Sequence, residues 1–199
     1  MRWTTLILIA SFLGGAWWWT HDRPVSRPPG VIAAAEPKQQ DLDPPPRFSE
    51  RGYTFTKRAR YDITARVLRK EIYRADGGAS LAPVDLAVGW GPVSDTTIID
   101  QLELSQMGRF FYWKPKDFAT FPLEMKALST HAAQMHLIPA TNELASRARL
   151  LRPGQLVTIG GYLVDVSGPG GFAWNTSLTR ADTGDGACEI VWVETIEVQ

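Results

Sequence analysis

The side chains best suited to chemistry in this sequence are its single cysteine and two histidines that precede it. A cysteine attacks as a thiolate, so it needs a base within hydrogen-bond reach. Cys188 could take His131 or His136 as that base, and Asp182 or Asp185 could orient the imidazole ring. No local signature of a cysteine hydrolase surrounds Cys188, and a free cysteine at the start of an apolar stretch is most often a small buried residue. An envelope hydrolase or transferase that uses Cys188 is therefore the alternative interpretation.

A second group of polar residues lies in the segment that leads to Cys188. Its members are the candidate binding residues Trp174, Arg180, Asp182 and Asp185. Loops on a rigid β scaffold commonly carry function, and an arginine can hold a carboxylate through two hydrogen bonds. A turn between two strands needs the same aspartates and glycines, so a structural role is favoured for the Arg180–Asp182 pair.

Short motifs give little support for a metal or an aspartic protease. His131 and His136 are five positions apart, which does not place them on one helix face. The acidic turn 182–186 lacks the oxygen-donor spacing of a calcium loop. The tripeptide at 182–184 occurs in aspartic proteases, but that chemistry needs a second copy from a symmetric dimer. We therefore expect no metal and no cofactor.

Basic residues are concentrated between positions 51 and 74. They are Arg51, Lys57, Arg58, Arg60, Arg66, Arg69, Lys70 and Arg74. Such a strand could bind anionic glycans, lipid head groups or nucleic acid, but charge that protects a solvent-facing strand is the commoner reason for the pattern. Four tryptophans, Trp90, Trp113, Trp174 and Trp192, could line a groove, although core positions are more usual.

The composition is that of an ordinary globular protein. Hydrophobic residues make up 44% of the 199 positions and charged residues 21%. The formal net charge is zero, so nothing global indicates a nucleic-acid partner. One cysteine excludes an internal disulfide. The length fits one domain with accessory segments.

The first twenty residues predict a transmembrane anchor. The stretch from Trp3 to Thr20 carries no charge and would span about 27 Å as a helix, close to the hydrocarbon thickness of a bilayer. Tryptophans at positions 17–19 suit the lipid–water boundary. A cleaved signal peptide, with the alanines at 33–35 as its processing site, is the other interpretation. We favour an uncleaved anchor at residues 1–20, because the spacer before those alanines is unusually long.

Residues 21–47 are predicted to be a proline-rich linker, and residues 48–199 the globular domain. The linker holds seven of the fourteen prolines, which fix the backbone and favour an extended spacer. An anchor at the N-terminus favours export of the chain on its C-terminal side. We therefore expect a single-pass protein of the bacterial inner membrane with a periplasmic C-terminal domain.

Several segments of the domain have the patterns of β-strands. Tyr61, Ile63, Ala65 and Val67 alternate with polar residues, which is the period of a half-buried strand. The continuous apolar run at 81–90 predicts a buried strand. Further strands are expected at 110–113 and in two long antiparallel segments of the last fifty residues.

Two short helices and a long bent strand complete the predicted fold. Ser94 is expected to cap the first helix, and Thr141 or Asn142 the second. Gly160 and Gly161 would permit a bulge in a long strand. The fold class is therefore mostly β with two short helices (α+β), arranged as a compact barrel or sandwich. An OB-like or SH3-like barrel is the specific expectation.

Four segments carry a resemblance to a family. PVDLAVGWGPVSD, HLIPA, LVTIGGYLVDV and TSLTRADTGDGACEIVWVE resemble segments of an uncharacterised family of short membrane-anchored bacterial proteins. The resemblance covers most of the domain from about Tyr61 onward and implies a bacterial origin. It implies no fold, activity or site residue.

The sequence as a whole favours binding over catalysis. A tether, a spacer and a domain without a convincing catalytic set predict a membrane-tethered extracytoplasmic binding or scaffolding domain. Its expected partners are the membrane, through the N-terminal helix, and a protein or other ligand of the envelope.

Overall fold

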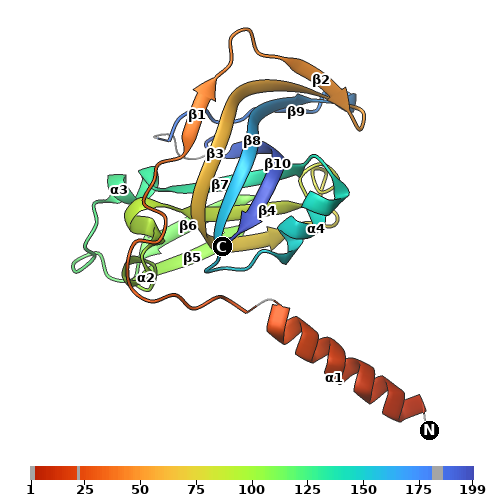
Figure 1. Ribbon diagram of the computed structural model, residues 1–199, viewed down its shortest axis with the longest axis vertical. Coiled ribbons are helices and arrows are strands. Elements are labelled where there is room, and N and C mark those ends of the chain that lie inside the picture. Colours follow the sequence, from red (N-terminus) through yellow and green to blue (C-terminus); the bar gives the residue numbers. More distant parts are fainter. Residues whose placement is uncertain (1–2, 22, 181–185) are drawn as a thin grey trace.

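The computed structural model describes residues 3–21, 23–180 and 186–199, which form mostly β structure with four α-helices (Figure 1). The helices are α1 (Trp3–His21), α2 (Thr96–Ile99), α3 (Met125–Thr130) and α4 (Asn142–Leu150), with two 3₁₀ turns, η1 (Gly91–Ser94) and η2 (Pro169–Gly171). The strands are β1 (Lys38–Asp41), β2 (Arg47–Glu50), β3 (Tyr53–Ile72), β4 (Val84–Gly89), β5 (Leu102–Met107), β6 (Phe110–Pro115), β7 (Ala132–Pro139), β8 (Leu156–Ser167), β9 (Ala173–Trp174) and β10 (Glu189–Val198). The predicted mostly β (α+β) fold class is confirmed, although α3 is an additional short helix beyond the two that the sequence predicted.

The long strand β3 organises the main sheet. Its C-terminal part pairs with β4, and residues 54–66 pair with β8, both in the antiparallel sense. β4 pairs with β7, β7 runs parallel to β10, and β10 pairs with β8. The pairings β3–β4–β7–β10–β8 therefore return to β3, and each of these five strands pairs with two others of the set. Strands β1 and β2 pair with β3, and β9 pairs with β8.

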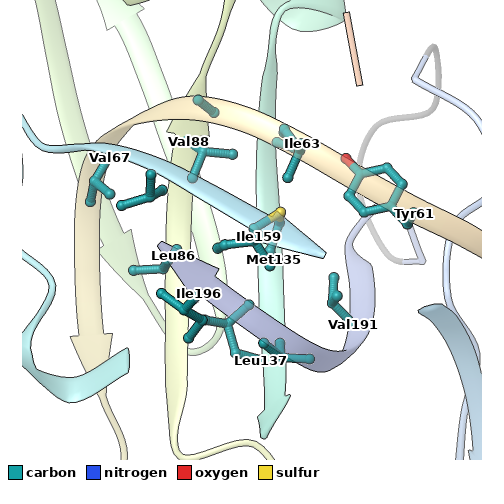
Figure 2. Close-up of a cluster of buried hydrophobic side chains, with 14 of the residues drawn as sticks. Tyr61, Ile63, Val67, Leu86, Val88, Met135, Leu137, Ile159, Val191 and Ile196 are labelled. Carbon is teal, nitrogen blue, oxygen red and sulfur yellow. The ribbon is translucent and has the colours of Figure 1, made fainter. Parts of the chain in front are cut away.

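Alternating apolar residues place the main core between these five strands. Tyr61, Ile63, Ala65 and Val67 of β3 are all buried, as the period of two predicts. Figure 2 shows three of them pointing towards apolar side chains from the other four strands. The core is therefore built from residues far apart in the sequence, which only the closed set of pairings brings together.

Two further apolar clusters cover outer surfaces of the sheet. One surrounds Phe55, Ile138 and Trp192 and packs against residues of β2 and β9. The other places the β5–β6 hairpin, α2 and α3 against β4 through Ala87, Leu102 and other buried side chains. All six residues of β4 are buried as a result, in agreement with the continuous apolar run at 81–90.

Gly160 and Gly161 of β8 lie opposite the irregular part of β10. A side chain at Gly161 would place its Cβ 1.9 Å from the carbonyl oxygen of Trp192. The register shifts on the partner strand β10, between Val193 and Thr195. The predicted irregularity is therefore present, but the extra residue lies on β10 and the glycines make room for it.

Side chains cap two helices, and one cap differs from the prediction. Thr141 caps α4 and accepts a hydrogen bond from the backbone of Leu144, as expected. The cap of α2 is Asp95 and not Ser94, because Asp95 accepts from the backbone of Thr97. The Ser94 hydroxyl instead accepts hydrogen bonds from two backbone N–H groups of the preceding segment.

The segment predicted as a linker packs against the domain from Val25 onward. The backbone N–H of Val25 donates to Pro153, and those of residues 30, 32 and 33 donate to the side chains of Asp95 and Ser94. Ala33 is buried in the main core, and β1 extends the sheet. The globular domain therefore begins well before residue 48. The prediction of a plain spacer overlooked these contacts. An extended chain still has backbone N–H groups that can donate to a neighbouring surface, and its proline-rich composition does not reveal them.

Helix α1 lies apart from the sheet in Figure 1, and its side chains from Trp3 to Gly15 are exposed. Among the residues that the structure describes, no helix combines the length and the apolar character needed to cross a bilayer. The anchor at residues 1–20 stays a prediction.

Candidate functional site

A carboxylate and an imidazole lie side by side on the outer face of the central strands. Asp85 of β4 is directly opposite His136 of β7, and their Oδ2 and Nδ1 atoms are 2.9 Å apart. Asp85 is fully buried and His136 is 3% exposed. The contact is close, but its angle falls outside hydrogen-bond geometry, so Nδ1 has no aligned partner. Buried polar groups of this kind need further partners, and the β5–β6 hairpin supplies one.

Arg109 reaches Asp85 from the turn between β5 and β6. Gly108 and Arg109 both have positive φ angles, as a two-residue type I′ hairpin turn requires. Arg109 Nη1 lies 3.1 Å from Asp85 Oδ1, while its Nε and Nη2 donate to the carboxylate of Asp76 at 2.9 and 2.8 Å. The guanidinium therefore bridges two carboxylates, one buried and one at the surface. Its hydrogen bonds hold the pKa of Asp76 below the usual range.

Two further side chains complete the network around Arg109. The Tyr73 ring lies 4.0 Å from the guanidinium carbon, and its hydroxyl accepts a hydrogen bond from the backbone of Arg109. Burial raises the pKa of Tyr73 to about 12. Gln134 donates to Asp85 at 3.4 Å and to the Arg109 carbonyl at 3.3 Å. The hairpin turn is thus fixed against the sheet by polar contacts on several sides.

A cavity adjoins this network. It measures about 410 Å³, and His136, Arg109, Phe110, Trp174 and Cys188 are among the residues that line it. The ring of Trp174 lies 4.6 Å from that of His136. Asn175 also lines the cavity and is exposed there. The site therefore combines aromatic faces with hydrogen-bonding side chains.

A second cavity continues from the first along β6. It measures about 320 Å³ and shares Phe110 and Cys188 with its neighbour. Tyr112, Trp113 and Arg180 line it as well. We call the two adjoining cavities the aromatic groove, defined by Phe110, Tyr112, Trp113 and Trp174 with Cys188 at the junction. A groove of this form suits an extended ligand with several flat faces.

The structure brings together some of the predicted catalytic residues. Cys188 and His136 line the same cavity. His131 is not among the described residues that line it. Asp182 lies outside the described residues, and the carboxylate next to His136 is that of Asp85. Cys188, half-buried, precedes the first residue of β10. His131 instead lies with its Nε2 3.3 Å from Glu36.

The predicted binding residues are divided between the two cavities. Trp174 lines the first and Arg180 the second. Arg180 Nη2 donates to the carbonyl of Pro37 at 2.8 Å, which ties the loop to the N-terminal segment. Asp182 and Asp185 lie outside the described residues, so the predicted Arg180–Asp182 pair has no structural account.

Most of the predicted basic surface is used in contacts within the domain. Arg58 pairs with Asp165, and Arg60 contacts Asp62 and Glu194. Of the tryptophans, Trp90 and Trp192 are buried members of the apolar clusters. Trp113 and Trp174 are partly buried, pack against such clusters and also line the groove. Arg58 and Arg60 therefore fit the interpretation in which the charges lie on a solvent-facing strand and do not bind a ligand. Arg66 is different, because it is buried.

Sequence reasoning missed Asp85, Arg109 and Gln134. One pattern could have found Asp85, since it is the only charged residue in the apolar run at 81–90. A charge in a strand that is buried on both faces needs a partner, and that need points to a long-range ion pair. Nothing local could have identified Arg109 as the partner, because the two residues are joined only by the folding of the hairpin.

No arrangement of three or more His, Cys, Asp or Glu side chains suited to a metal ion occurs among the described residues. Comparisons with family models, with curated protein sequences and with solved structures found no match.

Proposed function

We propose that this chain is a membrane-tethered binding domain built on an OB-like barrel. The closed set of five strand pairings supports the barrel. In chain order the third of these strands, β7, is followed by α4 and pairs in parallel with the fifth, β10, as in an OB fold. OB folds bind oligonucleotides and oligosaccharides on the face of their second and third strands, between flanking loops.

The aromatic groove occupies the corresponding face. Asp85 and His136 lie on the second and third strands, β4 and β7, and Trp174 and Cys188 lie between the fourth and fifth, β8 and β10. The position supports a ligand site, and the lining residues indicate its chemistry. The adjoining aromatic side chains at Phe110, Tyr112 and Trp174 are the observation that carries the proposal.

We infer that the ligand is a neutral saccharide. Sugar rings have apolar faces that pack on aromatic side chains, while their hydroxyls take hydrogen bonds from polar residues at the rim. The Arg109 guanidinium is already shared between Asp76 and Asp85, so it does not offer a free positive charge. This pairing disfavours nucleic acid or another polyanion as the ligand of the groove.

The membrane tether is proposed from the apolar segment that α1 contains. An uncleaved chain also fits the contacts of residues 25–35 with the domain, because processing after the alanines would remove Ala33 from the core. N-terminal sequencing of the membrane-extracted protein tests the tether. A mature chain that starts near Glu36 would contradict it. Digestion of the domain by protease only after spheroplasts are lysed would contradict the periplasmic location.

A glycan array that carries neutral and anionic oligosaccharides tests the groove. The expected result is binding to neutral saccharides, which Trp174→Ala removes. Phe118→Ala is a matched control, since Phe118 is an exposed aromatic residue that does not line either cavity. Binding only to anionic glycans, or binding that survives Trp174→Ala, would contradict the proposal.

Catalysis by Cys188 is a second candidate, favoured by the cavity that it shares with His136. Asp85 lies beside Nδ1 of that histidine, as the orienting group of a catalytic triad would. A nucleophilic Cys188 would be alkylated by iodoacetamide at neutral pH at a rate that His136→Gln lowers. A rate equal to that of an ordinary thiol in both proteins would exclude this candidate.

A further inference from the structure

Arg66 of β3 is a buried cation without an anionic partner among the described residues. The residue is 6% exposed. Its Nη1 donates to the Ser94 carbonyl at 3.0 Å and to the Thr96 hydroxyl at 2.7 Å, and both acceptors are neutral. No carboxylate of the described chain lies within ion-pair distance of the guanidinium. Burial lowers the pKa of Arg66, and the nearby carboxylates of Asp100 and Asp95 offset this effect only in part.

Arg66 lines a cavity that is distinct from the aromatic groove. The cavity measures about 560 Å³ and also receives Arg27, Arg69 and Lys116, against one carboxylate, Asp100. It lies between β3, α2, the β5–β6 hairpin and the segment 24–27. Four cations therefore share one concave space with a single acidic residue.

The other three cations form no ion pair with an acidic side chain of the described residues. Arg27 donates to the backbone oxygens of Gly154 and Gln199, and Lys116 donates to the carbonyl of Asp100 at 2.6 Å. Arg69 is exposed and has no hydrogen bond or ion pair with the described residues. These backbone contacts orient the Arg27 and Lys116 side chains towards the cavity wall. The cavity thus concentrates positive charge around a buried guanidinium, with Asp100 as the single acidic side chain of its lining.

We propose that this cavity binds the phosphate group of an anionic lipid. A phosphate accepts several charge-assisted hydrogen bonds at once, and the planar guanidinium matches its oxygens in a two-point contact. Leaving a buried charge unpaired is strongly unfavourable, so an anion bound in the cavity would offset the cost of burying the Arg66 guanidinium. The groups available are the remaining donors of Arg66 and the ammonium and guanidinium groups of Lys116 and Arg69.

The position of the cavity indicates a lipid as the source of the phosphate. Pro24 and Val25 line it, and α1 ends at His21. Three residues of extended chain span at most about 10 Å. If α1 is the membrane anchor, the cavity therefore opens at the level of the lipid head groups. The inference rests on the proposed tether, and the experiment separates the two.

Thermal melting of the full chain in lipid nanodiscs tests the site. We expect the melting temperature to be several degrees higher with phosphatidylglycerol than with phosphatidylcholine, since a ligand that binds only the folded state raises it. Arg69→Gln combined with Lys116→Gln should remove most of this difference. Arg74→Gln is the matched control, because Arg74 is an exposed cation of the same strand region outside the cavity. These variants leave the Arg66 contacts with Ser94 and Thr96 in place, so loss of folding does not confuse the result.

Each other outcome contradicts a defined part of the proposal. Equal melting temperatures in the two lipids, with normal incorporation into nanodiscs, would overturn the lipid site and leave the tether intact. Failure to incorporate would contradict the tether and, with it, a lipid as the ligand. If inorganic phosphate raised the melting temperature in zwitterionic nanodiscs as much as phosphatidylglycerol does, the site would bind free phosphate and the assignment to lipid would be overturned. A loss of the lipid effect in Arg74→Gln would show a diffuse surface charge effect instead of a site.

Discussion

Asp85 and Arg109 form an ion pair of 3.1 Å that joins the centre of β4 to the turn between β5 and β6. The Asp85 carboxylate is fully buried, whereas 16% of the Arg109 side chain is exposed. Strand β6 begins directly after Arg109 and lines the aromatic groove. The pair therefore fixes one wall of the proposed binding site to the sheet.

Arg109→Ala should lower the free energy of unfolding by about 3–5 kcal/mol, because it leaves a buried carboxylate without its cation. Urea denaturation measures this loss. Arg147→Ala is the control, since it removes an exposed pair with Glu143 on α4 and should change stability by about 0.5 kcal/mol or less. Asp85→Asn added to Arg109→Ala should restore part of the loss. If Arg109→Ala and Arg147→Ala lowered stability equally, the structural role of the buried pair would be contradicted.

Asp76 should make stability depend on pH in the acid range. Its folded-state pKa is lowered, chiefly by the hydrogen bonds from Arg109, so the unfolded chain binds its proton at higher pH. The contribution is complete above the ordinary pKa of 3.8 and is lost as pH falls through the lower folded value. Melting temperatures measured from pH 6 to pH 2 should fall less steeply below about pH 4 in Asp76→Asn than in the wild type. Parallel curves would contradict the proposed contact.

Truncation should show that the N-terminal segment is part of the fold. A chain that begins at Arg23 keeps the contacts of Val25 and Ala33 with the domain and should melt like the full chain. A chain that begins at Glu36 loses several backbone hydrogen bonds and a buried residue, so its free energy of unfolding should fall by about 2–4 kcal/mol. Circular dichroism during heating compares them. Identical melting of the two truncated chains would mean that the segment is a spacer after all.

Gly161→Ala should destabilise the protein by about 3 kcal/mol, because its Cβ would meet the Trp192 carbonyl at 1.9 Å and the backbone must move. Gly77→Ala is a suitable control, since nothing lies within 4 Å of the added carbon. Its effect should be small. Denaturant midpoints of the two variants give the comparison, and a tolerated Gly161→Ala would contradict the close approach of β8 and β10.

The elements that the sequence predicted well have regular local patterns. The alternation in β3, the apolar run of β4 and the Thr141 cap of α4 depend on residues that are near one another in the chain. Strand β7 was not predicted as such, because Gln134 and His136 interrupt its apolar pattern with polar side chains. Those side chains are buried by contacts with Asp85 and Arg109, which are remote in sequence.

The candidate site was only partly predictable for the same reason. Cys188, His136 and Trp174 were singled out by residue type, and the structure places them around one cavity. The partner of His136 was expected at Asp182, yet the neighbouring carboxylate belongs to Asp85 on the adjacent strand. Strand register decides which side chains meet, and nothing local in the sequence fixes the pairing of β4 with β7.

Isothermal titration with the neutral oligosaccharide that binds best on the array is the decisive test of saccharide binding in the aromatic groove. We expect one site per chain in the wild type and in Phe118→Ala, with affinity at least about tenfold weaker in Trp174→Ala, as happens when a stacking aromatic residue is lost from a binding site. Melting curves should show that all three proteins are folded. Unchanged affinity in folded Trp174→Ala, or no heat of binding from any neutral saccharide, would contradict the aromatic groove as the binding site.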